Sequence, residues 1–180
     1  MPCVVHEDAL LKKNVHDVFI AIGSNLGDRV TNLRIAREQM AAGIEITANS
    51  SVYETQPWGL VEQPDFLNQV VRGITSLTPY RLLVFLKKIE LRMGRAKTIR
   101  YGPRLIDLDV LLYDDRQVCN QRLTIPHPSM CQRAFVLVPL AEIIPDTIIP
   151  GTGLTVRQHL AKLEVTGITK VDTARLEVGE

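Results

Sequence analysis

Cysteine is scarce in this sequence, and the few that occur form no recognisable pattern. Cys3, Cys119 and Cys131 are the only cysteines in 180 residues. An odd, scattered set without a CxxC motif or a Cys/His cluster argues against both a disulfide framework and a zinc site. Free thiols persist in reducing compartments, so we expect a cytoplasmic protein.

Long hydrophobic runs and an excess of one charge are also absent. No apolar segment approaches the ~20 residues of a membrane-spanning helix, and residues 1–16 lack the apolar core of a signal peptide. The 21 basic and 20 acidic residues give a net charge of +1. Because no global field attracts nucleic acid or an acidic membrane, we expect neither as a partner.

The remaining composition is that of an ordinary globular protein. Hydrophobic residues make up 46% of the chain and charged residues 23%, which is typical of a soluble domain with one core. We expect residues 1–16 to be a surface extension, residues 17–165 to form a single domain, and residues 166–180 to be a loosely held tail. We expect a monomer.

Hydrophobic periodicity and capping residues predict the elements of this domain. Strands are expected at 18–22, 44–54, 66–76 and 105–113, and helices at 28–43 and 78–94. Their order, βαββαβ, predicts a ferredoxin-like α+β fold, an antiparallel sheet with helices packed on one face. A further strand near 117–125, a short proline-broken helix at 134–143 and a helix at 155–164 follow as C-terminal additions.

Two carboxylates stand out in the stretch RLIDLDVLLYDD, residues 104–115. Side chains alternate along a strand, so Asp107 and Asp109 share one face while their aliphatic neighbours take the other. Mg²⁺ is usually held by one or two carboxylates together with substrate phosphates. The pair is therefore a candidate metal clamp, and the alternative is a pair of rim acids salt-bridged to nearby arginines.

Basic residues gather just before this strand. From Arg81 to Arg104 the chain carries eight basic residues and a single acid, Glu90. A solvated helix face accounts for the first of them, but the acid-free loop that ends at Arg104 is better suited to a polyanion. The sequence has no GxxxxGK[ST] motif, so phosphate contacts would have to come from side chains.

Two loops carry further candidate ligand-binding residues. His127 lies between Pro126 and Pro128, which restrict the backbone on both sides and indicate a positioned side chain. Aromatic residues are only 5% of the chain, yet Trp58 and Phe66 occur close to Asn68. Aromatic rings and an amide suit a flat heterocycle, because the rings stack on its faces and the amide reads its edge.

Four segments together resemble the 6-hydroxymethyl-7,8-dihydropterin pyrophosphokinase family of folate biosynthesis. They read FIAIGSNLGDR, FLNQVV, GRAKTIRYGPRLIDLDVLLY and IPHPSMCQRAFVLVPLAEI. The resemblance covers residues 18–155. It implies a ferredoxin-like fold, ATP as co-substrate with two Mg²⁺ ions, and transfer of pyrophosphate to the hydroxymethyl group of the pterin with release of AMP.

The resemblance also implies roles for individual residues. Both metal ions would be held by Asp107 and Asp109, which with Arg95 and Arg104 would form the catalytic set. Contacts to ATP are implied for Lys97, Arg100, Tyr101, Arg104, Arg122, Thr124, His127 and Arg133. Contacts to the pterin are implied for Thr55, Trp58, Phe66, Asn68, Asp107 and Phe135, with the two phenylalanines on opposite faces of the ring.

Two other functions are compatible with parts of the pattern. A GS dipeptide and a DxD motif are typical of nucleotidyltransferases, although there they lie close together, whereas Ser24 and Asp107 are far apart here. A ferredoxin-like RNA-binding module would need exposed aromatic residues in a basic field. The near-zero net charge and the apolar strands argue against that reading.

Overall fold

A computed structural model describes residues 15–57, 62–94 and 102–172 of the chain. Its main strands are β1 (His16–Ser24), β2 (Glu45–Asn49), β3 (Val52–Thr55), β4 (Phe66–Thr75), β5 (Asp107–Tyr113) and β8 (Ile168–Val171). They form one antiparallel sheet in the order β5-β1-β4-β3-β8, and β2 pairs with β4 as well. The two central strands, β1 and β4, thus lie between the others.

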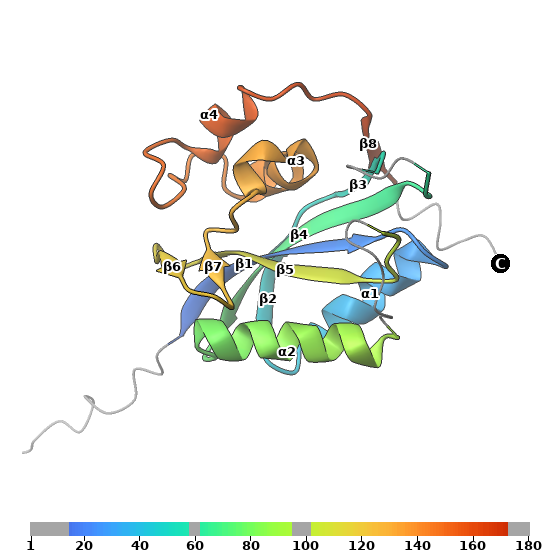
Figure 1. The fold of residues 1–180 in the computed structure, drawn as a ribbon, viewed down its shortest axis with the longest axis horizontal. Helices are drawn as coiled ribbons and strands as arrows, with labels where there is room; N and C mark the ends of the chain where they lie inside the picture. The colour runs from blue at the N-terminus through green and yellow to red at the C-terminus, as the bar shows by residue number, and fades with distance from the viewer. Residues whose placement is uncertain (1–14, 58–61, 95–101, 173–180) are drawn as a thin grey trace, which may run out of the picture.

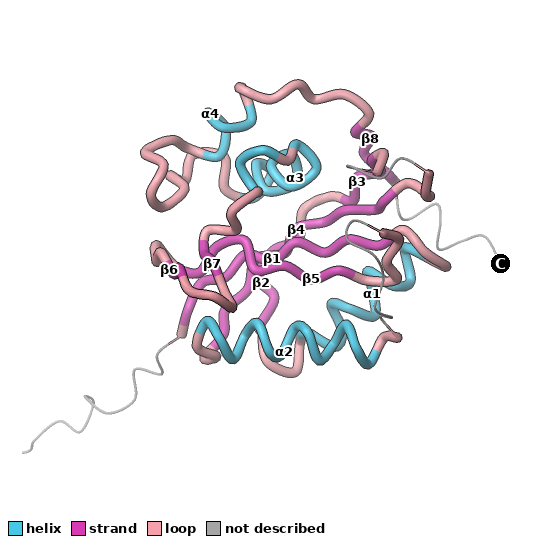
Figure 2. The backbone as a smooth tube through the Cα atoms, viewed as in Figure 1, coloured by secondary structure: helices cyan, strands magenta, loops and turns pink. Residues whose placement is uncertain are grey.

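Helices cover both faces of the sheet (Figure 1). On one face lie α1 (Arg29–Met40) and α2 (Pro79–Arg92), and on the other lie α3 (Ala134–Ile143) and the short α4 (Val156–Leu160). A small hairpin of β6 (Val118–Cys119) and β7 (Thr124–Ile125) and a 3-10 turn at Met130–Gln132 connect β5 to α3 (Figure 2).

The predicted ferredoxin-like βαββαβ order is confirmed by β1, α1, the β2–β3–β4 segments, α2 and β5. The layer formed by α3 and α4 on the second face goes beyond the one-sided arrangement expected from the sequence. No helix in the described part of the chain is both long and apolar enough to cross a membrane.

Two hydrophobic cores arise from the alternation of side chains along the central strands. Val18, Ile20 and Ile22 of β1 are buried against α1 and α2, whereas Phe19 of the same strand is buried on the α3 side. On β5, Leu108 belongs to the first core. Successive residues of a strand point to opposite faces, so each central strand contributes to both cores.

The single strand predicted at 44–54 is two strands in the structure. β2 pairs with the last part of β4 and β3 with its first part, and Ser50 stands between them. Its backbone N–H donates to the carbonyl of Val70 at 2.9 Å, and its hydroxyl accepts from the Val70 N–H at 3.0 Å. The serine side chain therefore replaces a regular ladder bond, and the strand breaks there.

Three expectations for individual segments need correction. The helix at 134–143 is not broken by Pro139, which lies inside α3. Val136, Leu137 and Leu140 of this helix pack in the core on that face of the sheet, and this packing outweighs the low helix propensity of proline. His16, assigned to the surface extension, begins β1. Part of the predicted tail is ordered as well, since β8 pairs with β3.

Glu142, near the end of α3, joins three parts of the molecule. Its carboxylate accepts hydrogen bonds from the Ser51 backbone N–H, from the Tyr53 hydroxyl at 2.9 Å and from Lys170 Nζ at 3.2 Å. Burial and this contact raise the pKa of Tyr53 to about 12. Burial would raise the pKa of Glu142, but its hydrogen bonds outweigh that effect and lower the pKa below 4.5. Glu142 therefore connects α3 to β3 and β8.

We expect Glu142→Gln to lower the free energy of unfolding by about 1–2 kcal/mol at neutral pH, because hydrogen bonds to a charged acceptor are lost or weakened. A carboxyl whose pKa is depressed by folding stabilises the protein above its unfolded pKa, and this contribution disappears as the pH falls through the folded pKa. The difference between the two proteins should thus shrink on acidification. Urea unfolding at pH ~7 and pH ~3 measures it.

Glu38→Gln is the matched control. Glu38 is exposed and pairs with Arg34 on the same helix, an arrangement worth about 0.3–0.5 kcal/mol. A loss for Glu142→Gln no larger than for Glu38→Gln would contradict the structural role assigned to Glu142.

Candidate active site

A cross-strand row of residues forms the floor of the candidate site. Gly23 in β1 is opposite Asp107 in β5 on one side and opposite Asn68 in β4 on the other. Two residues earlier in β1, Ala21 is opposite Asp109. Paired residues point to the same face, so Gly23 and Ala21 of β1 separate the carboxylates of β5 from the amide of β4. Because both residues are small, space is left above the sheet.

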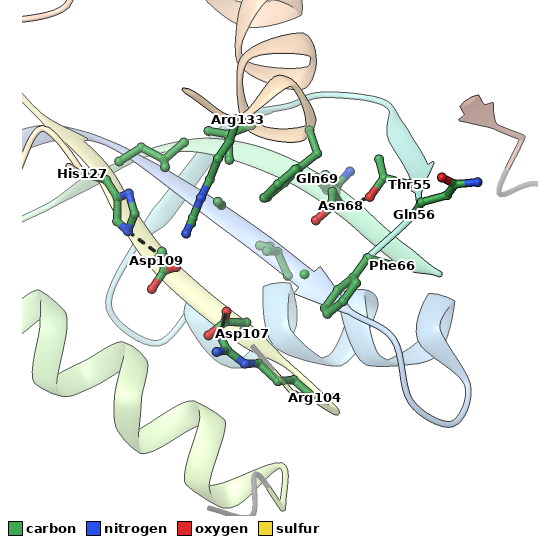
Figure 3. Close-up of a pocket in the computed structure, with 17 residues that line it drawn as sticks. Thr55, Gln56, Phe66, Asn68, Gln69, Arg104, Asp107, Asp109, His127 and Arg133 are labelled. Carbon is green, nitrogen blue, oxygen red and sulfur yellow. Dashed lines mark hydrogen bonds and ion pairs between the residues drawn. The ribbon is translucent and has the colours of Figure 1, made fainter. Parts of the chain in front are cut away.

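A pocket of about 180 Å³ lies over this floor, on the α3 face of the sheet. Figure 3 shows its two sides: Asp107, Asp109, Arg104 and His127 on the β5 side, and Phe66, Asn68, Thr55 and Gln56 on the other. Arg133 reaches down from the start of α3 between the two groups. The lining is completed by Ala21, Ile22, Gly23, Gln69, Gly102, Leu111, Phe135 and Val136.

The two carboxylates lie beside basic side chains. Asp107 forms an ion pair with Arg104, and Asp109 lies 3.4 Å from Lys87 Nζ and 3.9 Å from His127 Nε2. Burial alone would raise the pKa of Asp109, but the charges of Lys87, His127 and Arg104 outweigh it, so the pKa lies below its ordinary value. Asp109 is therefore ionised at neutral pH.

His127 is held over β5 by its own backbone. Its N–H donates to the carbonyl of Leu111 at 3.0 Å, and its Nδ1 lies 3.3 Å from the Ser129 N–H, which donates to it. The other ring nitrogen is thereby directed at Asp109. Burial lowers the pKa of His127 below 6.5, and it outweighs the opposing effect of Asp109. These contacts agree with the expectation that the backbone around His127 holds its side chain in a fixed position.

Arg104 is positioned by the turn after β1. The backbone N–H of Arg104 donates to Asn25 Oδ1 at 2.7 Å, and its carbonyl accepts from the Asn25 N–H at 3.0 Å. The Asn25 side-chain amide also donates to Gln63 and to the Pro64 carbonyl, both at 3.0 Å. A buried asparagine thus connects the segment before β5 with the segment before β4.

Ser24, the last residue of β1, is also structural. It is fully buried, and its hydroxyl donates to the Leu105 carbonyl at 2.6 Å and accepts from Asn32 at 3.1 Å. Through these contacts Ser24 fixes the position of the residues that precede β5. They leave no support for the nucleotidyltransferase alternative, in which the serine and the DxD motif would act together.

The opposite side of the pocket is aromatic and amide-rich. Asn68 is buried, and its Nδ2 donates to Thr55 Oγ1 at 2.7 Å. Phe66 is partly exposed and precedes Asn68 by two residues, so both point to the same face of β4. Phe135 lies under the guanidinium of Arg133, whose Cζ is 5.7 Å from the ring centre.

Most of the predicted site residues in the described ranges line this one pocket. They are Thr55, Phe66, Asn68, Arg104, Asp107, Asp109, His127, Arg133 and Phe135. Arg122 and Thr124 do not line it: both belong to the β6–β7 hairpin region, and Arg122 Nη1 bonds the hydroxyl of Tyr80 at 2.9 Å. Trp58, Arg95, Lys97, Arg100 and Tyr101 lie outside the described residues.

Several lining residues were not predicted from the sequence. The small residues Ala21 and Gly23 occur at alternate positions of a strand that is otherwise aliphatic, and this pattern could have indicated a cleft floor. Asn25 does not line the pocket, but it positions Arg104, which does. The contacts of Asn25 reach residues some 40 and 80 positions away in the chain, which no local pattern reveals.

Comparison with known families identifies the chain. The family model of 7,8-dihydro-6-hydroxymethylpterin-pyrophosphokinase (HPPK) matches residues 19–145. The chain belongs to this family. A HPPK from Methylorubrum extorquens, named 2-amino-4-hydroxy-6-hydroxymethyldihydropteridine pyrophosphokinase, is 48% identical over 86% of this chain and 98% of its own length. The similarly named Synechocystis enzyme is 42% identical over 91% of this chain and 84% of its own length.

Other HPPK sequences and structures are parts of longer proteins. The mitochondrial folate synthesis bifunctional protein of Arabidopsis thaliana is 46% identical over 74% of this chain, which corresponds to 24% of that protein. A crystal structure of Plasmodium falciparum HPPK-DHPS with pterin and p-hydroxybenzoate has a TM-score of 0.67 at 17% identity, covering 82% of this chain and 42% of that one. This likeness confirms the fold.

The family and the names of its members confirm the predicted function. The chain is a pyrophosphokinase of folate synthesis that acts on 6-hydroxymethyl-7,8-dihydropterin, an ATP-utilising diphosphotransferase. Family membership thus favours the pyrophosphokinase over the RNA-binding module considered from the sequence.

The floor of the pocket yields a direct test. A Cβ atom built on Gly23 would lie 3.4 Å from Asn68 Oδ1 and 3.8 Å from the Phe66 ring, so the branched side chain of Gly23→Val would project between them. We expect weaker pterin binding by roughly 1–3 kcal/mol from overpacking, with thermal stability retained because valine suits a strand. Calorimetric titration with the pterin, alongside thermal unfolding, measures both. Unchanged pterin affinity in a folded variant would show that the pterin does not bind over Gly23.

Proposed function

We propose that this pocket performs the transfer, with ATP on the β5 side and the pterin on the β4 side. The hydroxymethyl oxygen of the pterin forms a bond to the β-phosphorus of ATP, and its proton is released to solvent. The bond between that phosphorus and the oxygen bridging to the α-phosphate breaks, and AMP leaves. Asp107 and Asp109 would hold two Mg²⁺ ions together with the phosphates.

The observation that supports this arrangement best is the row Asp107–Gly23–Asn68 across three adjacent strands. Neighbouring strands are about 4.8 Å apart, so the carboxylate and the amide are separated by about two strand spacings. A heterocycle whose edge is read by Asn68 would thus carry its substituent toward Asp107. The sheet itself sets the distance between the two reacting partners.

The donor set fits a metal that arrives with a nucleotide. In the described part of the chain, no group of three or more His, Cys, Asp or Glu side chains could enclose a metal ion. Mg²⁺ needs no such cage, because it commonly takes one or two carboxylates and completes its shell with water and phosphate oxygens. When bound, the metal supplies charge neutralisation and polarises the phosphoryl group.

The side chains of the pocket bind and orient the substrates. Arg104, His127 and Arg133 bring donors to the side of the pocket where the triphosphate would lie. Arginine is suited to phosphate because its planar fork donates two parallel hydrogen bonds. Phosphoryl transfer depends mainly on such positioning and on charge stabilisation. Phe66 and Phe135 stack on the pterin, and Asn68 bonds its edge.

The reaction itself is tested by product analysis. The protein is incubated with ATP, Mg²⁺ and the reduced pterin alcohol, and nucleotides are separated by ion-exchange chromatography. Formation of AMP in equal amount to the pterin diphosphate is expected. Release of ADP or of free pyrophosphate would contradict the proposed transfer.

The carboxylate clamp predicts a specific mutational pattern. We expect Asp107→Asn and Asp109→Asn to keep the fold and to lose most activity, because one lost metal ligand removes several kcal/mol of charge stabilisation. Steady-state turnover with Mg²⁺ as the only divalent ion measures this. Asp65→Asn, a change in an exposed residue before β4, serves as the charge-matched control. Near-normal turnover in either clamp variant would refute the assignment.

The aromatic pair, Phe66 and Phe135, is expected to affect the binding of the pterin but not the binding of ATP. Phe66→Ala and Phe135→Ala should each weaken pterin binding by roughly 1–3 kcal/mol, on the scale of base–aromatic stacking. The affinity for a non-hydrolysable ATP analogue should stay almost unchanged, since neither ring lies on the β5 side. Fluorescence titration with each ligand separately checks this. An equal loss for both ligands would show that the rings act on the pocket as a whole.

A further inference from the structure

Among the described residues, the strand that carries the two carboxylates has a strand neighbour on one edge only. β5 is the last strand of the sheet order and pairs with β1. In an antiparallel pair the backbone groups of alternate residues point away from the partner, so a terminal strand has N–H and C=O groups that need other partners. The peptide groups of Leu108, the residue between Asp107 and Asp109, are of this kind.

Two side chains of α2 satisfy both peptide groups of Leu108. The Leu108 N–H donates to Glu90 Oε1 at 2.7 Å, and the Leu108 carbonyl accepts from Lys87 Nζ at 2.9 Å. Lys87 also donates to Glu90 Oε1 at 2.8 Å. Figure 1 shows α2 running along β5 on the face opposite α3. Glu90 and Lys87 thus take the place of a neighbouring strand at one residue.

The burial of Glu90 indicates that this arrangement is more than a solvated ion pair. Glu90 is only 2% exposed, and transferring a carboxylate from water into the interior is costly unless it is paired and hydrogen-bonded. A neutral side chain or water could have satisfied the Leu108 amide. A charged acceptor makes a shorter and stronger hydrogen bond, which restrains the strand more tightly.

Lys87 links this edge to the pocket. Its Nζ lies between Glu90 and Asp109, at 2.8 Å from one carboxylate and 3.4 Å from the other. Glu90 therefore shares the positive charge of Lys87 with Asp109. Without Glu90, the ammonium group would have Asp109 as its nearest carboxylate, where it would compete with a divalent cation.

We propose that Glu90, acting through Leu108 and Lys87, is a positioning residue that sets the direction and charge environment of the Asp107–Asp109 clamp. This inference rests on the proposed function of the clamp. Groups that orient metal ligands from behind typically change metal affinity or activity by about 10- to 100-fold. Glu90 lies on the far side of β5 from the pterin. A change at Glu90 should therefore alter turnover and metal–nucleotide binding, and it should leave pterin binding unchanged.

The first test needs no metal or substrate. Amide exchange is measured by NMR in the free protein for wild type, Glu90→Leu and Glu90→Gln. Loss of the acceptor in Glu90→Leu should speed exchange of the Leu108 amide roughly tenfold or more relative to the Asp109 amide, which faces β1 and reports general loosening. Glu90→Gln keeps an acceptor oxygen and should restore protection. Equal protection of Leu108 in all three proteins would overturn the proposal.

The second test separates positioning from a merely stabilising role. Binding of Mn²⁺ with a non-hydrolysable ATP analogue is followed by electron paramagnetic resonance, and kcat and the KM for pterin are measured. For Glu90→Leu we expect Mn²⁺ affinity and kcat to fall about 10- to 100-fold with the KM for pterin unchanged. Glu90→Gln should recover only part of kcat, because it keeps the acceptor oxygen for Leu108 but loses the negative charge that Lys87 shares with Asp109. Lys88→Met, which alters an exposed residue of the same helix, should match wild type.

The outcomes distinguish this inference from the proposed function. If Asp109→Asn loses Mn²⁺–nucleotide binding while Glu90→Leu retains both binding and kcat, the positioning role of Glu90 is wrong and the clamp stands. If Asp109→Asn binds Mn²⁺–nucleotide like wild type, the clamp itself is wrong. A Glu90→Leu variant that loses only thermal stability, with kcat and Mn²⁺ affinity intact, also overturns the inference.

Discussion

The antiparallel pairing of β1 with both β4 and β5 is the interaction on which the rest of the molecule depends. It places a carboxylate strand, β5, and an amide strand, β4, on either side of β1. Because strand spacing and side-chain alternation are nearly invariant, the pairing fixes both the width of the pocket and the face on which it opens. The helices then have defined tasks: α1 and α2 close one core, and α3 brings Arg133 and Phe135 over the other face.

Local patterns in the sequence were sufficient for the elements that make this framework. The alternation around Asp107 and Asp109 correctly predicted that both acids share a face, because the period of a strand is a property of neighbouring residues. The start of α1 was predictable for the same reason: Asp28 accepts a hydrogen bond from the Thr31 N–H at 3.0 Å. Charge and ring chemistry near the strand ends, together with the resemblance to the family, indicated nine of the residues that line the pocket.

Contacts between distant segments could not be predicted in this way. Asn25 connects Arg104 with Pro64, and Glu90 supports Leu108. Glu90 stands out as the single acid among eight basic residues, but neither sequence neighbourhood shows which distant segment the side chain contacts. Arg122 shows the converse: a basic residue with a family-implied role is bonded to Tyr80 outside the pocket. Which polar side chains meet depends on how the elements pack, and packing is decided over the whole chain.

The edge strand β8 has a consequence for self-association. It covers the outer edge of β3, whose other edge is paired with β4, and Val171 packs on the core shared with α1 and α2. An uncovered strand edge is a template for pairing with another chain. A protein shortened before Ile168 would keep every pocket residue of β4 and β5 but expose this edge beside Thr55. We expect such a protein to aggregate although its catalytic groups are intact.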